Sequence, residues 1–485
     1  MFKKHFLYIS LLLTIATLTP AQTMFAQKPA IDFTELEKVV RAELKETNTP
    51  GAAVAVVSND RVVFSKGFGV ASIETNAPVT PDMLFRIGST TKPFTAAAVL
   101  MLAEEGKINL DAGVGDYVEG LAPRLSRITV RQLLSHTAGI KDVDPDYGPH
   151  DEAALGATIR KWKDEDFFFT EPGRIFSYSN EGYDLLGLLI QEVAGKSYAQ
   201  SLRERLLVPL GMNKSVFRPV MAMTYPFAQG HTDDADEKAG EKKQLKVVRP
   251  FPDNVVGWPN GFLFSSANEL ARFAVALLND GKIEGKQAIS PSVIKVLRTP
   301  RVDIPAVGDK QRGEHHRYGY GMQFFDYRGI PLAIHNGGLT GFGCVFMTAP
   351  EQRFAVIILA NKSGQTLGKS ARKAMEMMLP LKAASETKQF SAVAMTEAEM
   401  KTYAGMYWNN DKLNAQLSIK EGKLFISFKE GDETENAPVQ KTGEHTFIIV
   451  APPGEPPGPA FVLIPGAGGK IEYLHFGNRA FKKVQ

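Results

Sequence analysis

Strand-forming and helix-forming sequence are segregated along this chain of 485 residues, and this segregation restricts its fold. Two apolar segments at 51–58 and 61–72 flank an Asn-Asp turn signal and predict a β-hairpin. Further strand signals return only after a long, mostly helical middle, in the segments 318–327, 331–338, 343–350 and 353–361. Strand groups at both ends of a helical middle predict an α/β (α+β) fold, in which helices flank one five-stranded antiparallel sheet.

The end of the chain follows a different pattern. Residues 381–395 are polar and rich in small side chains, as linkers are. Beyond them, short segments of alternating hydrophobicity predict a small all-β domain over 396–485. The main domain is therefore predicted to occupy residues 30–380.

The first 26 residues have the pattern of a secretory signal peptide. A basic MFKKH precedes the apolar segment FLYISLLLTIATL, which is too short to span a bilayer, and Ala21 and Ala26 are candidate cleavage points. No later segment is apolar enough for a membrane helix. The sequence therefore predicts a secreted or periplasmic protein with no stable membrane span.

Composition narrows the classes of partner and cofactor. The chain has 56 basic and 53 acidic residues, a net charge of +3, and no clustered basic face that would bind nucleic acid. Cys344 is the only cysteine and is interpreted as a buried apolar residue. The adjacent His315 and His316 lack a third ligand at zinc spacing, and Ile190 replaces the first glycine of a phosphate loop. We expect no metal and no cofactor, and the oligomeric state stays open.

One helix start carries the strongest chemical signal. Ser89 and Lys92 stand three residues apart, so they share a helix face and the lysine amine can reach the serine hydroxyl. The positive end of the helix dipole and burial both favour a neutral amine, which is a base beside a nucleophile. Gly88 allows a tight turn before the serine, Pro93 suits a first helical turn, and Gly106 suits the helix end.

The spacing alone is weak evidence, because three other serine-lysine pairs share it without this context. They are interpreted as solvated helix faces: Ser292 and Lys295, Ser370 and Lys373, and Ser385 and Lys388.

Two later motifs can complete a site around Ser89. Tyr178 and Asn180 stand just before a predicted helix, where a phenol near a lysine amine can act as a base and an amide can orient Lys92 or a substrate. The alternative is a turn with an asparagine cap. His335 ends a predicted strand and is followed by the 336–338 segment Asn-Gly-Gly. Such an edge lets a substrate backbone approach, and the alternative is a structural histidine.

These motifs, in this order and spacing, resemble those of the serine β-lactamase-like superfamily. The superfamily includes class C β-lactamases, penicillin-binding D,D-peptidases, D-aminopeptidases and related esterases, and the Ser-x-x-Lys element is one of its signatures. The resemblance covers about residues 35–380 and includes the segments 128–140, 318–324, 335–343 and 358–362. It implies a β-lactamase/transpeptidase-like fold, and the β-rich tail resembles the accessory domains fused to such proteins.

The resemblance also implies a role for each motif residue. It makes Ser89 the acylated nucleophile, Lys92 its general base or proton relay, and Tyr178 a second base. The substrate would contact Asn180, the electrostatic position at His335, and the glycine backbone of Gly337 and Gly338, where the Gly338 N–H would join the Ser89 N–H in an oxyanion hole.

The chain departs from the family pattern at the third motif. β-Lactamases and D,D-peptidases usually have lysine where this chain has His335, followed by threonine or serine where it has Asn336. A histidine with a reference pKa of about 6.5 is largely neutral at pH 7, so weak β-lactamase activity is expected. A Lys-Thr-Gly does occur at 441–443, but it lies in the tail and is interpreted as a turn.

The favoured hypothesis is an exported serine hydrolase that forms an acyl-enzyme with small esters, amides or D-residue peptides. A small molecule or peptide would be its partner, and nucleic acid would not. The first alternative is a β-lactamase or a penicillin-binding D,D-peptidase. The second is a non-catalytic ligand-binding or sensor protein with the same fold.

Overall fold

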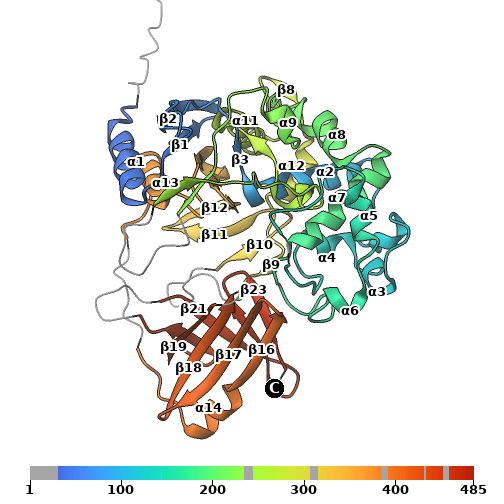
Figure 1. Cartoon of the computed structure of the whole chain (residues 1–485), viewed down its shortest axis with the longest axis vertical. Helices are drawn as coiled ribbons and strands as arrows, with labels where there is room; N and C mark the ends of the chain where they lie inside the picture. The colour runs from blue at the N-terminus through green and yellow to red at the C-terminus, as the bar shows by residue number, and fades with distance from the viewer. Residues whose placement is uncertain are drawn as a thin grey trace, which may run out of the picture.

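The computed structural model describes residues 31–143, 145–233, 244–305, 315–384, 391–430, 433–451 and 458–484. The predicted signal peptide at 1–26 lies outside the described residues. Within them, nine antiparallel strands form the main sheet in the order β2-β1-β15-β14-β12-β11-β10-β9, with β13 also paired to β14 (Figure 1). Their bounds are β1 Gly51–Ser58, β2 Arg61–Gly69, β9 Val302–Asp303, β10 Arg317–Tyr318, β11 Gln323–Tyr327, β12 Ile330–Ile334, β13 Gly337–Leu339, β14 Phe342–Ala349 and β15 Phe354–Ala360.

The predicted fold class is confirmed, and the sheet has more strands than predicted for local reasons. The segment 318–327 divides into β10 and β11 because Gly321 has a left-handed φ of 75° and Gly319 N–H donates to Met322 O across a turn. The segment 331–338 divides into β12 and β13 at His335. The predicted hairpin is β1 and β2, and both of its turn residues have positive φ, which matches the twist of a hairpin.

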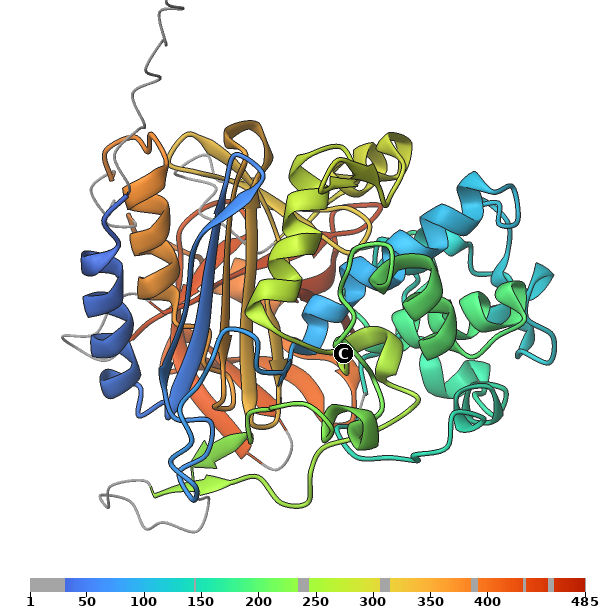
Figure 2. The same ribbon diagram turned by 90° about the horizontal axis from the view of Figure 1, so that it is seen from above.

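Helices cover both faces of the sheet. Helices α1 (Thr34–Glu46) and α13 (Gly368–Met378) pack together on one face, and α11 (Ala267–Leu278) and α2 (Lys92–Glu104) lie on the other (Figure 2). Strand β15 contributes Phe354, Val356, Ile358 and Ala360 to the core under α1 and α13, and its alternate residues Ala355, Ile357 and Leu359 to the core under α11. Burial on both faces explains why these strands are continuously apolar.

Helix α2 begins and ends as the sequence predicts. The short helix η1 (Gly88–Thr91) leads into it, Pro93 lies in its first turn, and Gly106 follows its end with a φ of 73°.

The other helices in the described part of the main domain are η2 Val114–Asp116, α3 Pro123–Ser126, α4 Val130–Leu134, α5 Ala154–Ile159, α6 Asp164–Phe167, α7 Asn180–Ala194, α8 Tyr198–Leu202, η3 Arg203–Leu207, α9 Pro219–Ala222, α10 Trp258–Gly261, α12 Pro291–Leu297 and η5 Pro350–Gln352. Short strands pair as β3 (Phe85–Arg86) with β6 (Phe264–Ser265), β4 (His231–Asp233) with β5 (Leu245–Val247), and β7 (Lys282–Ile283) with β8 (Lys286–Gln287).

The tail folds as a closed β-barrel, which confirms the small all-β domain (Figure 1). Helix α14 (Glu397–Tyr403) precedes it, and Thr396 caps that helix by accepting from Glu399 N–H. Residues 385–390 of the predicted linker lie outside the described residues, so the domain limits stay predictions. The barrel strands are β16 Gly405–Asn410, β17 Leu413–Lys420, β18 Lys423–Glu430, β19 Glu433–Lys441, β20 Thr446–Ile449, β21 Ala460–Pro465, β22 Ile471–Phe476 and β23 Arg479–Lys483.

The barrel packs directly on the main domain. Phe169 and Ile175 of the main domain form a buried apolar cluster with Tyr473 and Ala480 of the barrel. A hydrogen bond of 2.6 Å joins the hydroxyls of Thr170 and Tyr473. The barrel is therefore held against the loops that precede α7.

Cys344 lies buried in β14, as the sequence predicts. In the described part of the chain, none of the helices combines the length and the apolar character that crossing a bilayer requires.

A buried ion pair anchors the strand that leads to Ser89. Arg86, on β3, is fully buried and donates to Asp253 Oδ1 over 2.7 Å and to the carbonyl oxygen of Phe262. Its guanidinium also lies 3.8 Å from the centroid of the Phe264 ring. Because a buried cation is costly without its counter-ion, this pair fixes the position of β3.

We expect the Asp253→Asn substitution to lower the free energy of unfolding by about 3–5 kcal/mol, because it leaves a buried guanidinium without its counter-ion. Urea unfolding measures the change. The control is Asp111→Asn, which breaks the exposed pair with Arg131 and should change the free energy of unfolding much less, because water screens that pair. Equal losses in the two variants would contradict this role for the buried pair.

Candidate active site

The structure brings Ser89 and Lys92 together at the junction of η1 and α2. Ser89 is half-buried, whereas Lys92 is fully buried. The Lys92 amine, Nζ, lies 3.2 Å from Ser89 Oγ, 2.6 Å from Asn180 Oδ1 and 2.8 Å from the carbonyl oxygen of Asn260. The amine is therefore surrounded by three oxygens, one of which is the candidate nucleophile.

Helix α7 places the second motif. The Ser179 side chain caps this helix, so Asn180 is its first residue and Tyr178 lies immediately before it. The Asn180 amide nitrogen donates to Asp142 Oδ1 over 3.1 Å, which turns the amide oxygen toward Lys92. The Tyr178 ring centroid lies 4.8 Å from Lys92 Nζ, so the phenol ring lies beside the amine.

The end of β12 places the third motif. His335 follows this strand, and its carbonyl oxygen accepts from Thr90 Oγ1 over 2.9 Å, which ties it to the Ser89 turn. The two glycines of β13 lie against that turn. A Cβ atom on Gly337 would fall 1.8 Å from the carbonyl oxygen of Ile87, whereas a Cβ atom on Gly338 would meet no atom within 4 Å. The first glycine is required for close approach, and the second has open space beside it.

The His335 ring is neutral at pH 7. Desolvation by burial is the main cause that lowers its pKa from the usual 6.5 to about 3, and a protonated Lys92 nearby acts in the same direction. Its Nδ1 lies 2.8 Å from the carbonyl oxygen of Asn336. His335 therefore offers the site a dipole and not a positive charge.

A cavity of about 350 Å³ opens beside Ser89, and both domains line it. Its walls are Ser89, Tyr178, Tyr318, Gln323, Ile334, His335, Asn336, Gly337, Gly338, Gly364, Thr366, Asn478 and Arg479. Asn478 comes from the turn between β22 and β23 of the barrel, and Arg479 is the first residue of β23. The backbone N–H of Tyr178 donates to the Asn478 carbonyl oxygen over 2.8 Å, which fixes this turn in the wall.

Arg479 connects the barrel to the candidate lysine. Its Nε donates to Asp142 Oδ2 over 2.7 Å, and its Nη2 donates to the same oxygen. Asp142 in turn holds the amide of Asn180, which contacts Lys92. One chain of polar contacts therefore runs from the barrel to Lys92, the candidate general base.

Sequence reasoning missed several residues of this arrangement. Tyr318 and His136 lie in the segments 318–324 and 128–140, which resemble the family, so the resemblance could have marked them. No local signal marked Asp142 or Asn260. Arg479 was unpredictable because only the docking of the barrel brings it to the site.

The other serine-lysine pairs do not form comparable sites. The Ser370 hydroxyl is buried and donates to Glu43 Oε2 over 2.6 Å, and Ser292 on α12 contacts Glu104. The pair Ser385 and Lys388 lies outside the described residues. The Lys-Thr-Gly at 441–443 lies in the barrel, where Lys441 pairs with Glu399.

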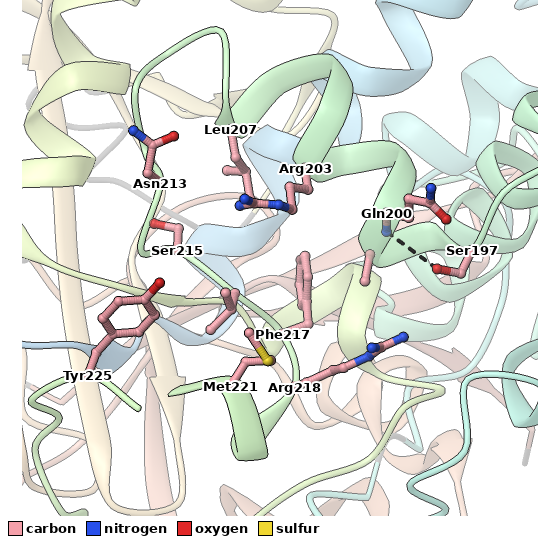
Figure 3. Close-up of a pocket in the computed structure, with 12 residues that line it drawn as sticks. Ser197, Gln200, Arg203, Leu207, Asn213, Ser215, Phe217, Arg218, Met221 and Tyr225 are labelled. Carbon is pink, nitrogen blue, oxygen red and sulfur yellow. Dashed lines mark hydrogen bonds between the residues drawn. The ribbon is translucent and has the colours of Figure 1, made fainter. Parts of the chain in front are cut away.

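A second cavity, of about 340 Å³, lies between α8 and α9 (Figure 3). Two serines line it, but Ser197 caps α8 and the Ser215 hydroxyl donates to Glu269 Oε2 over 2.6 Å. Among the described residues that line this cavity there is no lysine or histidine to activate either serine. Across all of the chain that the structure describes, no group of three or more metal-ligating side chains is placed to hold an ion.

Comparison with known proteins identifies the class. The family model described as Beta-lactamase matches residues 36–376, so the chain belongs to this family. Protein flp of Staphylococcus aureus (strain MW2) is 26% identical over 341 residues, which are 69% of this chain and 64% of flp. The chain thus spans less than two thirds of that relative. Penicillin-binding protein 4 of Amycolatopsis lactamdurans is 29% identical over 65% of this chain and 82% of its own length.

Solved structures share the fold beyond the matched family region. The crystal structure of SurE superposes with a TM-score of 0.72 at 24% identity and covers 93% of this chain and 98% of SurE. The octameric penicillin-binding protein homologue from Pyrococcus abyssi gives a TM-score of 0.62 at 24% identity, over 93% of this chain and all of that one. These similarities establish the architecture.

The two β13 glycines provide a matched pair of variants. We expect Gly337→Ala to lower stability by about 1–3 kcal/mol, because its Cβ would push β13 away from the Ser89 turn. Gly338→Ala should keep the stability of the parent, because its Cβ has open space. Thermal unfolding of the two variants measures the difference. Equal destabilisation would mean that β13 does not contact the turn as described.

Proposed function

We propose that this protein is a serine hydrolase that works through an acyl-enzyme on Ser89. The observation that carries the proposal is the position of Lys92 Nζ, 3.2 Å from Ser89 Oγ and in contact with two carbonyl oxygens. A neutral amine has two N–H donors and one lone pair. When the donors face Asn180 and Asn260, the lone pair faces the Ser89 hydroxyl and can accept its proton.

The chemistry proceeds in two halves. Ser89 Oγ attacks the substrate carbonyl while its proton passes to Lys92 Nζ, and the tetrahedral oxyanion is stabilised by the N–H groups of Ser89 and Gly338. The bond to the leaving group then breaks, and that group takes the proton from Lys92 through Tyr178. In the second half a water molecule attacks the acyl carbon, and Tyr178 and Lys92 take its proton. Ser89 Oγ leaves and recovers a proton.

We propose small esters, amides or D-residue peptides that carry a carboxylate as substrates. His335 is neutral and Asn336 has no hydroxyl, so the third motif provides little attraction for a carboxylate. Among the described residues that line the cavity, Arg479 is the only lysine or arginine. A cavity of about 350 Å³ suits a small ligand. A structure of the fold relative SurE contains D-Leu, which motivates the test of D-residue substrates.

A β-lactamase or D,D-peptidase is the second candidate. It is favoured by membership of the Beta-lactamase family and by the similarity to a penicillin-binding protein. Hydrolysis of a chromogenic cephalosporin at a rate comparable with that of esters would favour this candidate. A non-catalytic ligand-binding or sensor protein is the third, and it predicts no covalent adduct on Ser89.

The location and the domain limits are also proposals. The basic and apolar pattern of residues 1–26 supports export to the periplasm or the medium. Amino-terminal sequencing of the mature protein would test cleavage there. The limits 30–380, 381–395 and 396–485 are supported by the change from the helix-covered antiparallel sheet to the closed barrel.

A fluorophosphonate probe should label Ser89 on the full chain. We expect Ser89→Ala to abolish the adduct and to lower kcat/KM by about 10³-fold or more, because the nucleophile is lost. Ser292→Ala is the matched control, since Ser292 belongs to another serine-lysine pair and should leave labelling unchanged. Intact-mass spectrometry with peptide mapping measures the adduct. A well-folded parent protein that forms no adduct would exclude the serine hydrolase.

Arg479→Gln should weaken the binding of substrates with a free carboxylate. We expect KM to rise about tenfold for a D-residue peptide with a free carboxyl end and to change little for its carboxyl-terminal amide, because only the former loses a charged partner. The value of kcat should fall for both substrates, because Asp142 loses the partner that holds it against Asn180. In the parent protein this KM should not vary from pH 5.5 to 8, since the pKa of His335 is about 3. Equal KM changes for acid and amide would remove Arg479 as the anchor.

A further inference from the structure

Tyr318 lies between two buried histidines, one inside the candidate site and one behind it. Its hydroxyl oxygen lies 3.1 Å from His335 Nε2 and 3.2 Å from His136 Nε2. Both histidines and Tyr318 are buried, and the rings of His136 and Tyr318 lie 4.7 Å apart, centroid to centroid. His136 follows α4 and Tyr318 lies on β10, so the contact joins the helical region to the sheet.

The far end of this chain fixes the state of His136. Its Nδ1 lies 3.2 Å from the backbone nitrogen of Ser179, and a backbone N–H can only donate. Nδ1 is therefore the acceptor, and a neutral ring then carries its proton on Nε2. That proton points to the Tyr318 oxygen.

The near end fixes the state of His335 in the same way. Its Nδ1 lies 2.8 Å from the Asn336 carbonyl oxygen, which can only accept, so Nδ1 carries the proton. The neutral ring then has a lone pair on Nε2, and the Tyr318 hydroxyl is the donor that faces it. These assignments follow from the partners of each nitrogen.

We infer that His136 and Tyr318 are positioning residues that hold His335 as its neutral Nδ1–H tautomer through one directed chain of hydrogen bonds. The chain runs from Ser179 N–H to His136, from His136 Nε2–H to Tyr318, and from Tyr318 O–H to His335. The consequence of this chain of hydrogen bonds for catalysis rests on the proposed function. His335 is then a fixed neutral side chain in the cavity wall, and the positive charge beside the substrate comes from Arg479.

One competing arrangement exists. The Tyr183 hydroxyl, which donates to the Leu134 carbonyl oxygen over 3.0 Å, also interacts with Tyr318 and can accept a hydrogen bond from the Tyr318 hydroxyl. In that arrangement His335 is protonated at both nitrogens and donates to Tyr318. The surroundings of the two histidines oppose it, because burial lowers the pKa of both rings. A protonated Lys92 would act in the same direction, and Arg479 adds to the effect at His136. The rings of Tyr178 and Tyr183 also lie beside these histidines.

The direct test is the tautomer itself. Two-bond ¹H–¹⁵N correlation spectra of the full chain labelled at histidine, with His335→Gln used for assignment, report which ring nitrogen carries the proton. We expect His335 to remain Nδ1–H from pH 5.5 to 8. An Nε2–H ring, or a ring that titrates within this range, would overturn the inference. Because this measurement needs no turnover, its outcome is independent of whether Ser89 is acylated.

Tyr318→Phe removes the hydroxyl and keeps the ring. We expect His335 to lose its Nε2 donor, so that its ring changes tautomer or titrates above pH 5, while kcat/KM at pH 7 falls about tenfold for the loss of one buried hydrogen bond. The control is Tyr320→Phe. The Tyr320 hydroxyl does not line the cavity and accepts a hydrogen bond of 2.9 Å from Arg131 Nη1. That variant should change neither quantity. A Tyr318→Phe protein with an unchanged His335 spectrum would also overturn the inference.

Discussion

The buried amine of Lys92 is the contact on which the rest of the site depends. A lysine that is withdrawn from water needs polar partners, and here these partners come from η1, from the start of α7 and from α10. Burial of Lys92 therefore requires all three segments to be in position. The cap at Ser179, the amide contact between Asn180 and Asp142, and the buried ion pair of Arg86 all serve this positioning.

The barrel is a structural part of the candidate site. Its β22–β23 turn lines the cavity, and Arg479 holds the carboxylate that orients Asn180. An apolar cluster and the bond between Thr170 and Tyr473 keep this turn in place. Two domains that are separate in sequence therefore share one wall, and a change in barrel docking would reach Lys92 through Arg479, Asp142 and Asn180.

Much of the fold could be predicted because its signals are local. The β1–β2 hairpin, the start and end of α2, and the small all-β tail follow from turn residues, from a proline and a glycine at helix ends, and from alternating hydrophobicity. The extra strands could not be predicted, because the turn at 319–322 and the break at His335 interrupt segments that look continuous. The candidate residues of the three motifs were visible, but their separations of up to 249 positions carry no local signal of contact.

The sequence by itself determined that a serine and a lysine would share one helix face, because the helical period places residues three apart side by side. It also determined the mixed fold class and the family resemblance. Only the tertiary structure decided that the pKa of His335 falls to about 3, because this lowering depends mainly on how deeply the ring is buried. The same holds for Arg479, since its position in the cavity depends on how the barrel docks. Charge state and cavity composition depend on distances through space, and local sequence patterns do not encode these distances.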